Sequence, residues 1–305
     1  MKPSISFILN GKIRSLDQLQ KEILATFSAA FEVTFAITGG PMEGVKLAKA
    51  AAATQGGYVI AVGGDGLLNE VVNGILEAGV PNGVVAGVLP SGSGNDFAKS
   101  IEVQDTPAHL LSLIQHASIY PLDVGKMEFL NPEGNTATRY FINIADIGLG
   151  GEVMQAMQNS KQRFGADFAY SWAILKGFFT YRKKVVRLVT PEMEWEGLLL
   201  SLVMANGRYF GSGYCIAPHA DLANGQFALV ILGKVSVFDY IRHLPAIRKG
   251  KHIDHPEVTY TTATSLEVEG IQAPLCIEMD GEFIGTTPIT LSIQPQVLPF
   301  LANRT

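Results

Sequence analysis

The stretch YVIAVGGDGLLNEVVNGIL at residues 58–76 decides how the first part of this chain folds. Its first five residues are apolar and predict a buried strand, and apolar residues recur at helical spacing from Leu68 to Leu76. Between them lies GGDG at 63–66, where adjacent glycines let the backbone turn tightly and approach a ligand closely. The following helix presents free N–H groups and a positive dipole end, which favour phosphate. Asp65 adds a carboxylate that could hold Mg²⁺ against that phosphate.

A second glycine-rich loop, PSGSGNDFA at 90–98, follows the next apolar strand at 84–89. Ser93 can donate its hydroxyl to a phosphate, whereas Asn95 and Asp96 could simply cap the helix that follows. A single loop of this kind is often only a strand-to-helix turn that needs glycine. Two such loops on neighbouring strands favour a ligand site.

The first 123 residues alternate strand-like runs with helical patterns, which predicts an α/β domain with a parallel sheet and helices on both faces. The expected strands are residues 5–9, 31–38, 58–62 and 84–89, and the expected helices lie at 16–27, at 42–55 and after GGDG. In such sheets ligands bind outside the carboxyl ends of the strands, where both glycine-rich loops fall.

From residue 124 strand-like runs dominate, which predicts a mostly antiparallel β domain. The runs are 124–130, 140–144, 185–190, 198–205, 227–232, 258–262, 266–268, 275–279 and 289–293, interrupted by helical stretches near 151–181 and 236–249. A chain of 305 residues is long for one core, so we expect two domains, 1–123 and 124–293.

The bulk composition, 47% apolar with a formal net charge of −5, is that of a globular protein and argues against a nucleic-acid partner. Cys215 and Cys276 are expected as buried thiols. The apolar stretch at the N-terminus is too short for a signal peptide, and the apolar run at 198–205 is too short to span a bilayer. We therefore expect a cytoplasmic protein with at most a peripheral contact at the inner membrane face. The sequence leaves a homodimer open.

Other nucleotide-binding motifs do not fit. The dinucleotide fingerprint G-x-G-x-x-G should open the first strand-to-helix turn, which here reads Asn10-Gly11-Lys12. The P-loop pattern is absent from the sequence. Late in the chain, DGE at 280–282 begins with a hairpin-turn signal and is, by itself, most typical of a solvated hairpin. The six histidines show no metal-ligand spacing.

Five separated motifs agree in order with one family. Together they resemble the diacylglycerol kinase catalytic family. The motifs are GGDG with Asn69 and Glu70, LPSGSGNDFA at 89–98, LDVGK at 122–126, ANGRYFGSGYCIAPHA at 205–220 and DGE at 280–282. The opening ILNGK resembles the YegS-like branch of bacterial lipid kinases. The resemblance implies a nucleotide domain similar to those of NAD kinases and phosphofructokinases, a β-sandwich domain, and a segment 294–305 that returns to the first domain.

The resemblance also implies residue roles and an ATP-dependent transfer to a lipid with a free hydroxyl, such as diacylglycerol or phosphatidylglycerol. Glu282 would take the proton from the lipid hydroxyl, and Asp65 would organise Mg²⁺. A structural Mg²⁺ loop would use backbone carbonyls of Asp221 and Gln226 and the side chain of Asn224. The nucleotide would contact Asn10, Thr38, Gly63, Gly64, Asp65, Gly66, Leu67, Leu68, Asn69, Glu70, Ser93, Gly94, Asn95 and Asp96.

Two residues depart from the family pattern. Leu67 replaces the usual threonine of GGDGT, and Asn224 replaces the usual aspartate of the metal loop. These departures leave open the alternative that the chain is a lipid- or nucleotide-binding protein with little kinase activity. An NAD kinase is a third possibility, because such enzymes also use a GGDG motif, but LPSGSGNDFA and DGE argue against it.

The segment FAYSWAILKGFFTYRKKVVR at 168–187 allows two interpretations. Its periodicity favours a core helix followed by a strand. Its aromatic residues, followed by a run of cations, are also typical of a docking site on an anionic membrane. The residues in question are Trp172, Phe178, Phe179, Tyr181, Arg182, Lys183, Lys184 and Arg187.

Overall fold

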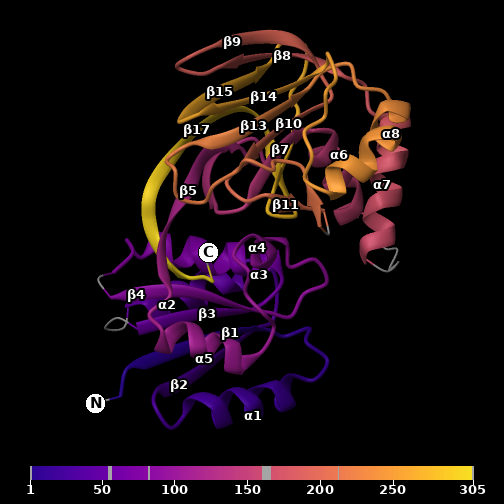
Figure 1. Ribbon diagram of the computed structural model, residues 1–305. Coiled ribbons are helices and arrows are strands. Elements are labelled where there is room, and N and C mark those ends of the chain that lie inside the picture. The colour runs from indigo at the N-terminus through magenta and orange to yellow at the C-terminus, as the bar shows by residue number, and fades with distance from the viewer. Residues whose placement is uncertain (1, 54–56, 82, 160–165, 212, 304–305) are drawn as a thin grey trace. The chain divides into compact units, whose positions relative to one another are not determined.

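The computed structural model describes residues 2–53, 57–81, 83–159, 166–211 and 213–303, without the side chains of 159–172. The chain divides into two compact units, 1–122 with 296–305, and 123–295 (Figure 1). The first is α/β and the second is mostly antiparallel β, as the sequence predicts. None of the described helices has the length and apolar character needed to cross a bilayer.

The first unit is a parallel sheet with helices on both faces. Its elements are β1 (Ser4–Asn10), α1 (Leu16–Phe27), β2 (Glu32–Thr38), α2 (Glu43–Ala53), β3 (Gly57–Gly63), α3 (Asp65–Glu77), β4 (Val84–Pro90), α4 (Asp96–Ser100) and α5 (Pro107–Gln115). The strand order is β4-β3-β1-β2. Helices α1 and α5 lie on one face of the sheet and α2 and α3 on the other (Figure 1). This arrangement follows from right-handed crossovers on both sides of β1.

Helix α3 is buried over most of its length because it packs between the sheet and α2. Gly74 makes this close packing sterically possible. A Cβ there would lie only 2.3 Å from the carbonyl oxygen of Val45 in α2. The helix that follows GGDG is therefore held rigidly, and so is its N-terminal end.

The second unit consists of antiparallel strands with three helices. Its elements are β5 (Ile119–Leu130, beginning in the first unit), β6 (Thr136–Phe141), β7 (Ile144–Gly148), α6 (Leu149–Asn159), α7 (Ala166–Thr180), β8 (Lys184–Val189), β9 (Glu194–Leu199), β10 (Ser201–Ala205), β11 (Tyr209–Phe210), β12 (Tyr214–Cys215), β13 (Phe227–Leu232), α8 (Val237–Arg248), β14 (Val258–Ala263), β15 (Ser265–Gly270), β16 (Cys276–Met279) and β17 (Glu282–Leu301). Strands β14, β13, β10, β7, β16 and β17 follow one another in the sheet.

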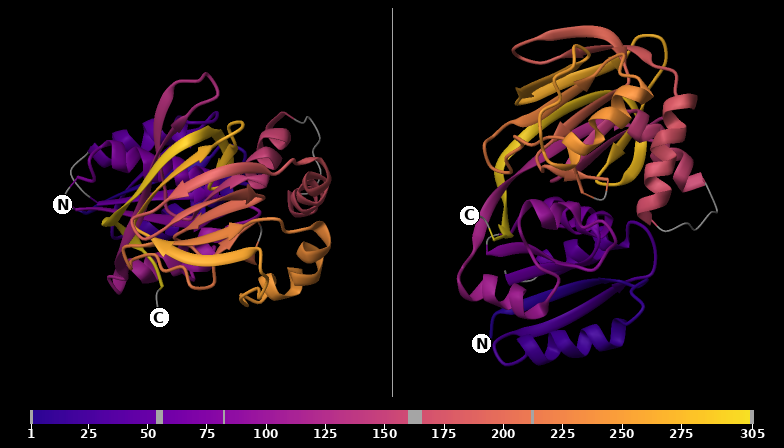
Figure 2. Two further views of the ribbon diagram at one scale, coloured as in Figure 1. Left: turned by 90° about the horizontal axis from the view of Figure 1, so that it is seen from above. Right: turned by 45° about the vertical axis from the view of Figure 1, so that its right-hand side comes forward.

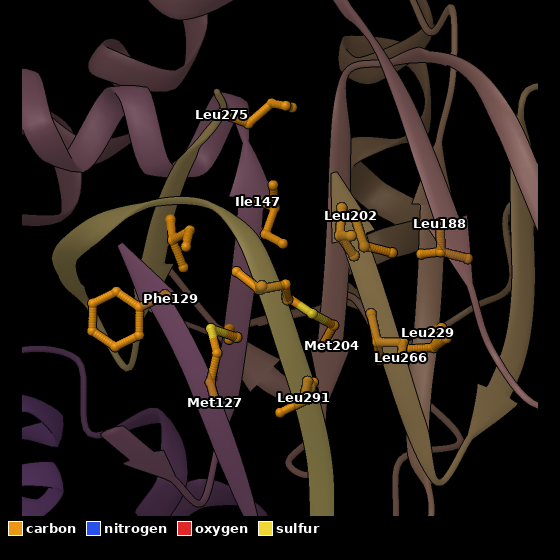
Figure 3. Packing of buried hydrophobic residues seen from close by; sticks show 14 of the residues in the cluster. Met127, Phe129, Ile147, Leu188, Leu202, Met204, Leu229, Leu266, Leu275 and Leu291 are labelled. Atoms are coloured by element: carbon orange, nitrogen blue, oxygen red, sulfur yellow. The ribbon is translucent and has the colours of Figure 1, made fainter. Parts of the chain in front are cut away.

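One large apolar cluster fills the inside of this unit. It includes Met127, Ile147, Leu202, Met204 and Leu291, which converge from β5, β7, β10 and β17 (Figure 3). Helices α6, α7 and α8 gather beside one another on the unit (Figure 2). They cover the opposite face of β7, β10 and β13, where separate buried clusters form.

Several expected boundaries differ from the structure. The run 198–205 belongs to two strands, β9 and β10, which have different partners. The run 140–144 likewise divides between β6 and β7. The helical stretch near 151–181 contains α6 and α7, and residues 160–165 lie outside the described chain. Strand β17 is longer than expected, and its last residues pair with β4, where Phe300 lies opposite Ala86.

Candidate functional site

The loops after the first two strands meet at one edge of the first unit's sheet. Asn10 at the end of β1 lies opposite Thr38 at the end of β2. The Asn10 side chain accepts the N–H of Lys12 at 3.0 Å, which shapes the first loop. The Thr38 hydroxyl oxygen accepts the N–H of Gly11 at 3.4 Å, so it ties the two strand ends together. Both predicted residues therefore lie at the carboxyl end of the sheet, where such folds bind ligands.

The two glycine-rich loops touch each other backbone to backbone. Gly63 pairs with Pro90 at the ends of β3 and β4, and the N–H of Ser91 binds the Gly63 carbonyl at 3.0 Å. Next along, a Cβ added to Gly92 would lie 2.5 Å from Cα of Gly64. Only glycine at position 92 permits this approach. The sequence predicts two phosphate-type loops, and the structure brings them into one surface.

Asn95 shapes the second loop. Its backbone adopts a left-handed φ of 52°, and its side chain bonds both the N–H and the carbonyl of Gly92, at 3.0 and 2.8 Å. It stands at the N-cap position of α4 but gives no side-chain cap there. The alternative interpretation, in which Asn95 caps this helix, does not hold, because its amide is used within its own turn.

Asp65 supplies the cap instead. Its Oδ2 accepts the N–H of Asp96 and its Oδ1 accepts the N–H of Phe97, each at 3.0 Å. Burial raises the pKa of this carboxyl, although the two backbone N–H groups oppose that shift. Asp65 thus joins the first glycine-rich loop to the first turn of α4. Each oxygen of a carboxylate retains a further lone pair, so a metal or water ligand is still compatible with this geometry.

Glu70, one turn further along α3, has a similar role. Its two oxygens accept the N–H groups of Met42 and Gly44, at 2.9 and 2.8 Å, at the start of α2. Leu67 is 7% exposed and packs toward Gly63 and Gly44, so it fills space instead of presenting a polar group. Sequence reasoning assigned Glu70 to the nucleotide, and the structure shows it shaping the loop that follows β2.

The remaining predicted nucleotide residues divide by exposure. Ser93 is exposed, and Gly64, Gly66 and Gly94 are half-buried. Leu68 and Asn69 lie inside the unit at 2% and 1% exposure. Asp96 is buried and forms an ion pair with Lys99 at 2.8 Å. Ser93 and the loop glycines are therefore the predicted residues most available to a ligand.

In the second unit, DGE forms the hairpin between β16 and β17. Asp280 and Gly281 have φ values of 45° and 89°, as the Asp-Gly signal predicts, and Met279 pairs with Glu282 across the turn. The Asp280 carboxylate accepts the N–H of Ile144 at 2.9 Å. Asp280 therefore fastens the turn to β7.

Glu282 is 31% exposed at its side chain, and its Oε2 accepts a hydrogen bond from Arg139 Nη2 at 2.7 Å. Arg139 lies on β6 and is 13% exposed. This partner was missed, because an arginine in the run TATRYF gives no signal that it meets a residue near the end of the chain. The guanidinium holds one oxygen of the carboxylate in a fixed direction.

The predicted metal loop is tied together by its own hydrogen bonds. Asp221 Oδ1 accepts the N–H of Ala223 at 2.9 Å, and Asn224 Oδ1 accepts that of Gln226 at 3.0 Å. The fully buried Asp123, which sequence reasoning left without a role, accepts the N–H of Gly225 at 2.6 Å. Within the described chain no three acidic, histidine or cysteine side chains gather as metal ligands. A metal held by Asn224 and backbone carbonyls stays a prediction.

Comparison with known proteins adds two family matches. The model of the diacylglycerol kinase catalytic domain matches residues 5–127. The model of the YegS C-terminal NAD kinase beta sandwich-like domain matches residues 143–302. The two matches together cover most of the chain.

Individual relatives agree with these matches. A protein of Chromohalobacter salexigens named "Probable lipid kinase YegS-like" is 28% identical over 90% of this chain and 85% of its own. A diacylglycerol kinase of Staphylococcus aureus is 30% identical over 80% of this chain and 74% of its own. A crystal structure of a diacylglycerol kinase from Bacillus anthracis superposes with a TM-score of 0.73 at 18% identity, over 99% of this chain and 97% of that one.

Proposed function

This chain is a lipid kinase of the diacylglycerol kinase family, and we propose that it transfers the γ-phosphoryl group of ATP to a hydroxyl of a diacylglycerol-like lipid. The observation that carries the nucleotide half of the proposal is the contact between the two glycine-rich loops at Gly64 and Gly92. Together they offer a small surface of glycine backbone next to the N-terminal end of α3. Such a surface suits the triphosphate of a nucleotide.

Positioning and charge stabilisation supply most of the catalysis in phosphoryl transfer. In our proposal the loop N–H groups and the exposed Ser93 hydroxyl hold the phosphates, while Asp65 and Glu70 keep the loops in place through α4 and α2. Magnesium would balance the triphosphate charge when bound, and Asp65 has the lone pairs to help hold it. The loop 221–226 would hold a second, structural ion through Asn224 and backbone carbonyls.

The acceptor half of the proposal rests on Glu282. Arg139 occupies Oε2, which leaves Oε1 to accept the proton of the lipid hydroxyl as its oxygen attacks phosphorus. Arg139 is then a positioning residue and Glu282 the catalytic one.

A nucleotide- or lipid-binding protein with little kinase activity is the second candidate. The specific observation in its favour is Leu67, whose buried side chain stands where the family has a hydroxyl. Binding without transfer is what this candidate predicts, so an assay of transfer separates the two.

Peripheral contact with an anionic membrane is a further proposal, and in the structure fewer of the predicted residues are available for it. Phe178 packs against Tyr240 with ring centroids 4.9 Å apart and is half-buried, and Tyr181 is buried, so neither ring is freely exposed on the surface. Lys184 and Arg187 pair with acidic side chains. The side chain of Trp172 lies outside the described residues. The remaining support comes from Phe179, which is 75% exposed, from the exposed Arg182 and from the half-buried Lys183.

We expect Gly92→Ala to weaken nucleotide binding at least about fivefold. The new methyl group must push Gly64 away, and overpacking of this kind costs about 1–3 kcal/mol, or roughly a factor of 5 to 160. Gly40→Ala is the matched control, because a Cβ there meets no atom within 4 Å. Calorimetry with a non-hydrolysable ATP analogue measures both variants. Equal affinity of Gly92→Ala and wild type for the analogue would mean that this loop does not bind the nucleotide.

The function itself is tested by incubating the purified chain with γ-labelled ATP, Mg²⁺, diacylglycerol, phosphatidylglycerol, a sphingoid base and NAD in separate reactions. We expect label in at least one lipid and none in NAD. Label in NAD alone would replace the proposal with a dinucleotide kinase. Nucleotide binding with no labelled product would support the second candidate.

A further inference from the structure

Strand β16 carries an acidic residue on a buried face. Its neighbours in the strand, Ile277 and Met279, belong to the apolar cluster inside the second unit. Because side chains alternate along a strand, Glu278 faces the other side of the sheet, where it is only 5% exposed. Glutamate is seldom buried to this extent, because burying its carboxyl group costs free energy that an apolar side chain would not.

The strand beside β16 adds to this cost. Glu278 lies directly opposite Asp146 of β7, which is 2% exposed. Two acidic residues that face each other on neighbouring strands destabilise the sheet when both are charged. The pairing of β16 with β7 therefore gives no reason for an acid at position 278.

Glu278 forms a short hydrogen bond to the turn that precedes Glu282. Asp280 and Gly281 lie between the paired ends of β16 and β17, so their N–H groups need partners outside the strand ladder. The N–H of Asp280 donates to the carbonyl of Ile144 at 2.9 Å. The N–H of Gly281 donates to Oε1 of Glu278 at 2.6 Å. Both N–H groups of the turn are thus held by the protein.

The second of these bonds fixes the backbone one residue before Glu282. Arg139 holds the Glu282 carboxylate at its far end, through Oε2. The bond from Gly281 to Glu278 holds the other end, where the side chain leaves the turn. A misplacement of about 1 Å at a reacting group can lower a rate by roughly 10²-fold, so the position of this turn matters for proton transfer.

We propose that Glu278 is a positioning residue for Glu282: by accepting the N–H of Gly281, it holds the turn where Glu282 can take the proton of the lipid hydroxyl. The inference rests on the proposed role of Glu282 as the base. Position 278 then needs an acceptor oxygen, which glutamine also supplies and an apolar side chain does not. Loss of the acceptor should lower kcat without lowering stability, which separates a positioning role from a structural one.

The test combines steady-state kinetics, on the lipid that the wild type phosphorylates best, with thermal unfolding. Glu278→Leu should lower kcat at least about tenfold and leave the KM for ATP within about twofold of wild type. Its melting temperature should be no lower than that of wild type, because a buried acid opposite Asp146 has been removed. Glu278→Gln keeps an acceptor oxygen, so it should lose no more than about threefold in kcat.

Glu257→Leu is the matched control. The Glu257 side chain also accepts a backbone N–H in a turn, that of Lys234 at 2.8 Å, after β13. Its kcat should stay within about twofold of wild type, because sites without shared partners act independently. An equal loss of kcat in this control would overturn the inference, since the effect would then not belong to the turn before Glu282.

Other outcomes would overturn the inference as well. They are a kcat of Glu278→Leu within about twofold of wild type, a loss in Glu278→Gln equal to that in Glu278→Leu, or a melting temperature that falls together with kcat. A normal kcat in Glu282→Gln would instead contradict the proposed role of Glu282. An inactive Glu282→Gln beside a fully active Glu278→Leu would overturn this inference alone.

Should Glu278→Leu not fold, hydrogen exchange of the Gly281 amide in the wild type tests the same bond. The bond to Glu278 predicts exchange at least about tenfold slower than in an unstructured peptide. Exchange of this amide at the rate of an unstructured peptide would overturn the inference without any variant.

Discussion

Glu282→Gln is expected to lower kcat by about 10²- to 10⁴-fold with a much smaller change in KM. The amide keeps the shape of the carboxylate and can still accept a hydrogen bond from Arg139, so the turn between β16 and β17 should stay in place. What it loses is the ability to take a proton. The measurement is steady-state kinetics on whichever lipid the wild type phosphorylates best.

A matched control exists in the same unit. Arg187 on β8 and Glu194 on β9 form an exposed ion pair of the same length, 2.7 Å. Glu194→Gln should leave kcat within about twofold of wild type, because an exposed pair contributes little. Arg139→Gln should lie between the two, since it leaves the base present but less well oriented. A near-normal kcat for Glu282→Gln would remove this residue from the role of base.

Asp146→Asn is expected to make the protein more stable than wild type at pH 8, by up to roughly 4 kcal/mol in the free energy of unfolding. Burial raises the pKa of Asp146 from 3.8 to about 7, although Ser201 and the Gly150 N–H oppose the shift. Between these values the folded protein retains a proton that the unfolded chain has lost. Wild type therefore loses stability, relative to the uncharged variant, as the pH rises through this window.

The measurement is denaturant unfolding of both proteins between pH 4 and pH 8. The difference between them should be small at pH 4, grow with pH, and level off above about 7. Ser201→Ala, in a protein that keeps Asp146, should increase the loss of stability with rising pH, because the Ser201 hydroxyl stabilises the charged form of Asp146. A difference that does not change with pH would mean that Asp146 ionises in the folded protein as readily as in the unfolded chain.

Local patterns were sufficient to predict most of the fold. In the first unit each strand and helix has its own apolar period, so β1 to β4 and α1 to α3 were expected close to their observed bounds. The run 198–205 shows why the second unit was harder. Its residues are almost uniformly apolar, yet β9 pairs with β8 whereas β10 pairs with β7 and β13. A continuous apolar run does not indicate where a chain changes partner.

The site was predictable only in part, for a related reason. The glycine-rich loops are local signals, and both lie where the sequence placed them. The caps that Asp65 and Glu70 supply join residues about thirty positions apart, and Arg139 meets Glu282 across 143 positions. Asp146 carries no sequence signal either, because its importance depends on the helices that cover it. Such roles arise from packing, which spacing along the chain does not reveal.

In our proposal the glycine-rich loops deliver a phosphoryl group to a lipid hydroxyl. The most direct measurement is a single-turnover reaction of γ-labelled ATP and Mg²⁺ with lipid, with wild type and with Asp65→Asn in parallel. We expect the wild type to transfer label into an organic-soluble phosphomonoester, and the variant to do so at least about 10²-fold more slowly, because it loses both the charge and one cap of α4. Label that appears only as inorganic phosphate or in NAD, or equal rates for the two proteins, would contradict the claim.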